Sequence, residues 1–151
     1  MAITVTTAMP TSFKVEILKA VHNFTASTGN TFKLALLKAT AAGSGTFGAA
    51  TTNYSNLSTD ELATATGYTQ PGNTLVSATP VADSTTAICD FADTTWTSSS
   101  FTTCGGLIYN SSASGAACAV LSFGGDQTVS SGDFQIQFPV AAAATAIIRI
   151  A

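Results

Sequence analysis

Two aspartates, Asp126 and Asp133, are the residues whose type and spacing first suggest chemistry in this chain. They lie seven positions apart in the stretch LSFGGDQTVSSGDFQIQFP, in a 151-residue sequence with only eight acidic side chains. Paired carboxylates can bind a cation or transfer protons in acid–base catalysis. Aspartate beside glycine is also typical of turns, where the carboxylate accepts hydrogen bonds from nearby backbone N–H groups. We predict this turn-making role, with Gly124 and Gly125 allowing a bulge or positive-φ turn between two strands.

The other candidates for catalysis or metal binding are few. His22 is the single histidine, and we expect it at a helix end or on the surface, because a catalytic base must be held beside a nucleophile. Asp90 and Asp93 could form a calcium pair, but no loop of further oxygen ligands accompanies them, so we interpret them as strand-end and turn residues. The sequence has no G-x-S-x-G elbow, Walker loop or H-E-x-x-H helix. We therefore predict that the chain is not an enzyme and has no catalytic, cofactor-binding or metal-binding residues.

Three cysteines, Cys89, Cys104 and Cys118, have an odd count and no C-x-x-C spacing. Each lies among small and apolar residues, in an expected strand or at its end. We interpret them as buried free thiols of a protein made in a reducing cytoplasm, with a disulfide between two of them as the alternative.

Aromatic residues offer a further possibility, a face that stacks on sugar rings. In the alternative, the tryptophan fills the core and the tyrosines close strand ends with their hydroxyl groups outward. The sequence leaves both interpretations open for one set of residues: Trp96, Tyr54, Tyr68 and Tyr109.

The elements that must position these side chains begin with one helix. Residues 12–24 have apolar side chains at spacings of three and four, after Pro10 and a cap at Thr11 or Ser12. Residues 31–39 indicate a largely buried strand, and the small residues of 41–53 a mobile or partner-contacting loop. The pattern around Ser58 to Glu61 indicates the start of a helix of one or two turns.

From residue 66 onward the pattern is that of β-structure. An apolar strand ending at Tyr109, a Ser/Gly turn and a strand from Cys118 to Phe123 predict a hairpin. In FQIQF, period-two alternation places Phe134, Ile136 and Phe138 on one face. We predict a mainly β fold: residues 12–151 form a single antiparallel β-sandwich or jelly-roll-like domain with one short N-terminal helix, preceded by an N-terminal arm, residues 1–11.

Composition restricts the classes of function. Charged residues make up 9% of the chain, against about 25% in a typical soluble domain. A surface coated with hydroxyl groups and small apolar groups suits a protein that is packed against neighbours. The net charge of −3 and only five Lys and Arg residues argue against nucleic acid as a partner. We also expect no secretory signal and no membrane span.

The ordered series of motifs resembles a family of small structural proteins of tailed bacteriophages. The motifs are FKLALLKA, YSNLSTDELATATGYTQPGNTL, ICDFADTTWTSSSFTTCGGLIYN, AVLSFGGDQTVSSGDFQIQFP and AIIRI, and they span residues 31–151. The sequence departs from the family pattern at residues 104–106, where a basic residue is usual, and at Phe138-Pro139, where another aromatic is usual.

This resemblance implies a virion component without enzymatic activity, assembled in the host cytoplasm. We expect a capsid decoration (cement) protein on the capsid surface that binds the major capsid protein and forms a homo-oligomer. The arm at 1–11 and the loop at 41–53 are the expected contact segments. The alternatives are a tail or head-fibre-base component and a carbohydrate-binding adhesion module.

Overall fold

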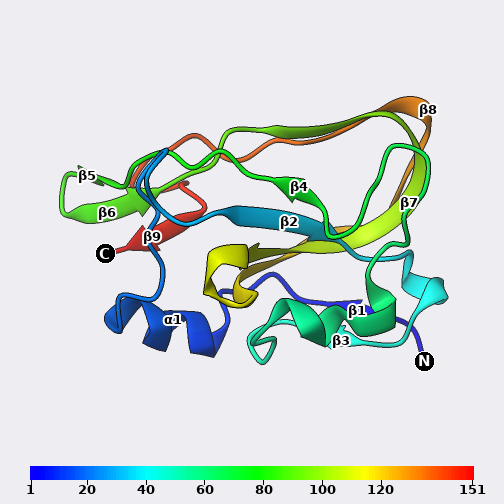
Figure 1. Ribbon diagram of the computed structural model, residues 1–151, viewed down its shortest axis with the longest axis horizontal. Coiled ribbons are helices and arrows are strands. Elements are labelled where there is room, and N and C mark those ends of the chain that lie inside the picture. The colour runs from blue at the N-terminus through cyan, green and yellow to red at the C-terminus, as the bar shows by residue number, and fades with distance from the viewer.

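The computed structural model describes residues 1–151, and antiparallel strands form most of its regular secondary structure (Figure 1). The main sheet has the order β4-β2-β7-β8 and contains Asn73–Thr74, Phe32–Leu36, Thr94–Asn110 and Ala116–Ile136. A second sheet, β5-β6-β9, contains Val81–Asp83, Thr86–Cys89 and Ile148–Ile150. The remaining pair, β1 (Thr4–Val5) and β3 (Thr46–Phe47), is parallel.

One α-helix, α1 (Thr11–Leu18), and three short 3-10 stretches complete the fold. The 3-10 stretches are η1 (Thr40–Ala42), η2 (Tyr54–Asp60) and η3 (Ser111–Ala113). None of these helices is long and apolar enough to cross a membrane. The prediction of a mainly β, antiparallel domain with one short N-terminal helix is therefore confirmed, whereas the finer prediction of a sandwich or jelly roll is not confirmed by these three sheets.

The helix is shorter than the predicted 12–24. Its N-cap is Pro10, without a side-chain cap, so the expected cap at Thr11 or Ser12 is absent. It ends at Leu18 because Ala20 adopts a positive φ of 57° and reverses the chain. The reversal turns Phe24 into the core, where its ring stacks on Phe32 with centroids 4.3 Å apart. The apolar spacing thus marked the two buried phenylalanines, Phe13 and Phe24, but Val21 is exposed and only the first half of the segment is helical.

The long β7–β8 hairpin dominates the main sheet. Its turn is η3, followed by Ser114 and Gly115 with positive φ, which confirms the hairpin prediction. The second strand differs from the prediction: AVLSF and the first three residues of FQIQF belong to one continuous strand, β8, which ends at Ile136, and are not two strands joined by a turn. Near Ser58, η2 begins earlier than expected, at Tyr54 under an Asn53 capping box. Ser58, with φ 46° and ψ −122°, divides η2 into two short 3-10 turns, and the second lies where a helix start was expected but ends at Asp60.

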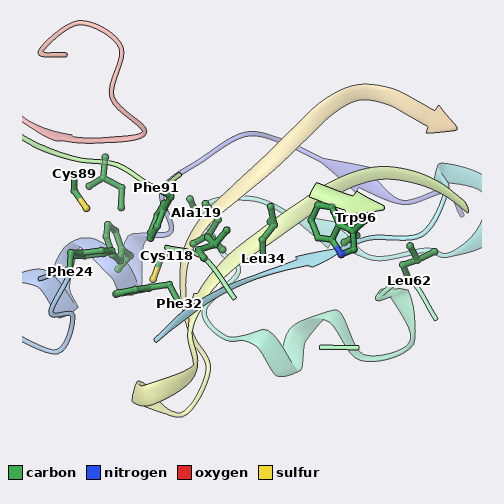
Figure 2. Packing of buried hydrophobic residues seen from close by; sticks show 14 of the residues in the cluster. Phe24, Phe32, Leu34, Leu62, Cys89, Phe91, Trp96, Cys118 and Ala119 are labelled. Atoms are coloured by element: carbon green, nitrogen blue, oxygen red, sulfur yellow. The ribbon is translucent and has the colours of Figure 1, made fainter. Parts of the chain in front are cut away.

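Two hydrophobic clusters cover opposite faces of this sheet, as expected when alternate strand residues point to opposite sides. The larger one contains Phe32, Leu34, Trp96 and Cys118 (Figure 2). The smaller one is built around Leu37, Leu57 and Leu107 and includes Ile3 from the N-terminal segment and Phe47 from the 41–53 segment.

Both segments that were expected to contact partners are held against the domain. Ile3 is 4% exposed and β1 pairs with β3, while Ala8 and Val120 exchange backbone hydrogen bonds. In the 41–53 segment, Phe47 is buried, and Asp60 accepts hydrogen bonds from the N–H groups of residues 44 and 45.

Candidate functional site

The two aspartates Asp126 and Asp133 act separately. Residues 123–126 of β8 lie opposite the single residue Cys104 of β7, so FGGD forms an enlarged β-bulge. Gly124 and Gly125 have φ of 75° and 141°, which confirms the predicted bulge. The bulge brings Asp126 Oδ1 to within 2.7 Å of the N–H and 2.6 Å of the hydroxyl of Thr40. These hydrogen bonds favour the ionised carboxylate and lower the pKa of Asp126.

Asp133 accepts a hydrogen bond from the N–H of Ser98, 35 positions away, at 3.1 Å. Both aspartates therefore bind backbone N–H groups, as predicted, but they join distant segments and do not form local turns. Asp93 has a similar role and accepts from the N–H of Phe138 at 2.9 Å. Asp90 is half-buried at the end of β6. No group of three or more His, Cys, Asp or Glu side chains in the chain is arranged to hold a metal ion.

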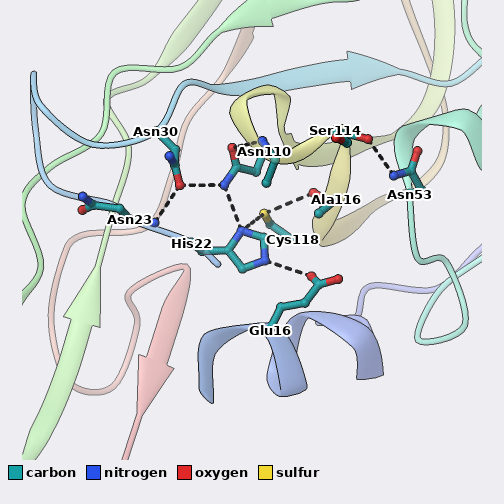
Figure 3. A network of polar contacts seen from close by, with 10 residues as sticks. Glu16, His22, Asn23, Asn30, Asn53, Asn110, Ser114, Ala116 and Cys118 are labelled. Carbon is teal, nitrogen blue, oxygen red and sulfur yellow. Dashed lines mark hydrogen bonds and ion pairs between the residues drawn. The ribbon is translucent and has the colours of Figure 1, made fainter. Parts of the chain in front are cut away.

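His22 differs from its prediction, because its side chain is fully buried. Figure 3 shows its ring between Glu16, Asn110 and Cys118. Its Nδ1 lies 3.1 Å from Asn110 Nδ2 and 3.7 Å from the Cys118 sulfur, and its Nε2 lies 2.9 Å from Glu16 Oε2. The chain reversal at Ala20 is the cause, since it points the ring inward between α1 and the end of the β7–β8 hairpin.

The partners of Asn110 fix the tautomer of His22. Asn110 Oδ1 accepts from the N–H of Ala113, so the Nδ2 group points away and donates to Asn30 Oδ1 and to His22 Nδ1. A nitrogen that accepts a hydrogen bond carries no proton, so the proton of neutral His22 lies on Nε2 and is donated to Glu16. Asn30 in turn accepts from the N–H of Asn23. This network, from Asn23 to Glu16, ties the N-terminal helix and its following loop to the main sheet.

Cysteine, histidine and asparagine together are the residue types of a nucleophilic site, so the state of Cys118 matters. The Cys118 side chain is 0% exposed, and burial raises the pKa of its thiol. A protonated, enclosed thiol is a weak nucleophile, so the arrangement favours structural support. All three cysteines are free and buried, which confirms that prediction. Burial raises the pKa of Cys89 to about 12.

A second buried polar group surrounds Glu61, which is 4% exposed. The hydroxyls of Tyr54 and Tyr68 both donate to its carboxylate, and the N–H of Leu36 donates to Tyr68 at 3.1 Å. Burial, and after it the Glu61 carboxylate, raise the pKa of Tyr54. Burial also raises the pKa of Tyr68, which Glu61 raises further. The two phenols thus satisfy a buried carboxylate that has no cation beside it.

Of the four aromatic residues proposed as a sugar-binding face, three are buried and Tyr54 is half-buried. Trp96 is 3% exposed and lies in the larger cluster, as the core interpretation required. Tyr68 and Tyr109 are also buried, and their hydroxyls bind Glu61 and the carbonyl of Pro71 within the fold. The expectation of outward hydroxyls is therefore wrong. The half-buried ring of Tyr54 stacks on Tyr109, and its hydroxyl also binds Glu61.

The strand β8 has one long accessible edge. Its inner edge pairs with β7, and the start of its outer edge meets the N-terminal segment at Val120 and Ser122. From residue 123 to 136 no other strand pairs with this outer edge. Along it, exposed polar residues alternate with the half-buried Val129, Phe134 and Ile136.

Sequence reasoning missed the two buried polar groups, because their members lie far apart in the chain. His22 and Cys118 are 96 positions apart, and no local motif connects them. The only local signals for these two groups were the single histidine, His22, and the acidic residue Glu61 beside a predicted turn.

Comparison with known proteins adds no relationship: no family model, no curated protein and no solved structure matches this chain.

Proposed function

We propose that this chain is a non-enzymatic virion structural protein, a capsid decoration protein that binds the major capsid protein and stabilises the phage head. The order of its motifs resembles small structural proteins of tailed phages, which gives the proposal its class. The observation that carries it further is the unpaired outer edge of β8, residues 123–136.

An unpaired strand edge presents a row of backbone N–H and C=O groups to another chain. Partner strands recognise such edges through main-chain hydrogen bonds, and side chains at alternate positions supply specificity. In β8 the half-buried Val129, Phe134 and Ile136 pack against the larger cluster, so the exposed hydroxyl and amide side chains between them are the ones that face a partner. Only two of its residues, Asp126 and Asp133, carry a charge. Few charges must therefore lose water when a partner covers this edge.

The low overall charge supports the same class. A stable interface buries about 1,200–2,000 Å² in total, and a decoration protein forms such contacts with shell subunits and with its own copies. A homo-oligomer on the capsid surface is accordingly part of the proposal.

Copy number in purified particles tests the location. Quantitative mass spectrometry of virions should find hundreds of copies, in a fixed ratio to the major capsid protein. A handful to a few dozen copies would indicate a tail or head-fibre-base component, and absence from washed particles would refute the virion assignment.

Binding to capsids that lack this protein tests whether the outer edge of β8 contacts the capsid. Lysine on an edge strand opposes pairing with another strand, so the double variant Ser130→Lys and Gln135→Lys should lower capsid occupancy by at least tenfold. A matched control, Ala82→Lys and Thr85→Lys, adds the same charge at exposed positions of the β5–β6 hairpin. Equal occupancy of the two variants would refute the role of the β8 edge.

A further inference from the structure

An apolar groove runs between α1 and β9, away from the β8 edge. Its outer part has a volume of 370 Å³ and lies between residues 13–18 of the helix side and residues 148–151 of the strand side. A smaller depression of 120 Å³ shares Ile17, Ile148 and Ile150 with it and extends to Phe24 and Cys89. The two depressions therefore adjoin at these three isoleucine side chains.

Two large hydrophobic side chains on this groove are exposed to solvent. Leu18 is 88% exposed and Ile150 is 54% exposed, on opposite walls. Ligand sites in proteins are typically mostly apolar concavities of about 300–1,000 Å³ with a few polar groups that fix orientation. The combined groove has this size and composition.

Both charged side chains that line the groove are cationic. They are Lys14 and Arg149, two of only five Lys and Arg residues in a chain with a net charge of −3. Nη1 of Arg149 donates to the carbonyls of Ala143 and Ala144, and the guanidinium keeps its charge and its other N–H donors. The neighbouring acid, Glu16, is engaged by His22. Charge complementarity with these two side chains favours an anionic occupant.

We propose that the α1–β9 groove binds an unbranched acyl chain with a carboxylate head group. The carboxylate lies at Lys14 and Arg149, and the chain runs past Leu18 and Ile150 toward Ile17. This inference does not depend on the proposed role in the virion.

The proposal predicts a dependence of affinity on chain length. Each buried methylene strengthens binding about fourfold, so titration calorimetry below the micelle concentration should find dodecanoate about 200-fold tighter than octanoate. Dodecylammonium, with the same chain and the opposite charge, should bind more weakly than dodecanoate. Affinity that is independent of chain length, or equal for the two head groups, would refute the proposal.

NMR of the isoleucine methyl groups locates the bound acyl chain. Dodecanoate should shift the methyl resonances of Ile17, Ile148 and Ile150 and leave those of Ile3 and Ile108 unchanged. Shifts spread over all isoleucines would indicate detergent-like binding and overturn the proposal. Dilution of the ligand-free protein tests whether a second copy of the chain occupies the groove instead. If the resonances of Ile17, Ile148 and Ile150 move as a dimer dissociates, the groove belongs to a second copy and the proposal is overturned.

Two pairs of variants complete the test without risk to the core. Leu18→Ser should weaken dodecanoate binding by at least tenfold, whereas Val76→Ser, at an exposed valine outside the groove, should not. Lys14→Gln should weaken it about two- to fivefold, as expected for a solvent-exposed charge contact, and Lys19→Gln should not. Equal effects within either pair would refute the assignment of the site.

Discussion

The network around His22 makes a quantitative prediction for the variant Asn110→Leu. Leucine has a similar size but cannot make the three side-chain hydrogen bonds of Asn110, to Ala113, Asn30 and His22. Each such bond contributes about 1 kcal/mol, and buried partners left without one cost more. Because Asn110 is 0% exposed, water cannot replace these bonds. We expect the free energy of unfolding to fall by about 3–5 kcal/mol.

Urea unfolding monitored by Trp96 fluorescence measures this change, since Trp96 is the only tryptophan and is buried in the larger cluster. For a domain of this size, the loss corresponds to a fall in Tm of about 6–20 °C. The control Asn73→Leu removes a partly exposed amide that binds Thr94 and Thr95. It should cost less than about 2 kcal/mol.

A double-mutant cycle tests whether the bond to His22 belongs to this network. Asn110→Leu and His22→Phe should be non-additive by at least about 0.5 kcal/mol, as for residues that share a hydrogen bond. A loss below about 1 kcal/mol for Asn110→Leu, or strict additivity in the cycle, would refute the reasoning. Nitrogen NMR of His22 should also find the proton on Nε2, and an Nδ1–H tautomer would contradict the assignment.

Three further predictions follow from burial. The pKa of all three tyrosines is raised in the folded protein, to about 12 for Tyr109, so absorbance at 295 nm should show no ionisation step near pH 10 until the chain unfolds. Because these folded-state pKa values lie above the value of about 10 for unfolded tyrosine, they contribute stability that is complete below about pH 10 and is lost as the pH rises through the folded-state pKa. A titration step of the native protein at about pH 10 would contradict this. The three buried thiols should resist a thiol reagent such as DTNB in the native protein and react fully in urea, and fast native labelling of any of them would contradict their burial. Removal of residues 1–10, or Ile3→Ala alone, should lower the free energy of unfolding by about 2–4 kcal/mol, because Ile3 is 4% exposed in the smaller cluster; unchanged urea unfolding would mean that the segment is not part of the fold.

Local signals predicted several elements because their physical causes are local. The hairpin at Tyr109 to Cys118 was indicated by small turn residues between apolar strands, and η3 followed by a positive-φ Gly115 provides that turn. The alternation of Phe134 and Ile136 with glutamines correctly predicted which side chains of β8 point toward the core, because successive side chains of a strand point to opposite faces. The small and apolar neighbours of the cysteines also indicated their burial correctly.

Other features depended on contacts between distant segments. The apolar spacing of residues 12–24 was interpreted as one helix, yet the reversal at Ala20 places His22 beside Asn110 and Cys118, 88 and 96 positions away. Asp126 has a glycine bulge beside it in sequence, but its partner Thr40 lies 86 positions away.

The sequence by itself determined the β-rich class, the hairpin, the facing of alternate residues and the scarcity of charge, because each follows from short-range sterics or from composition. Only the tertiary structure decided which polar groups are buried together, which strand edge is left unpaired and where the groove between α1 and β9 opens. Hydrogen-bond partners and concave surfaces are properties of packing, and packing joins residues that no local pattern connects.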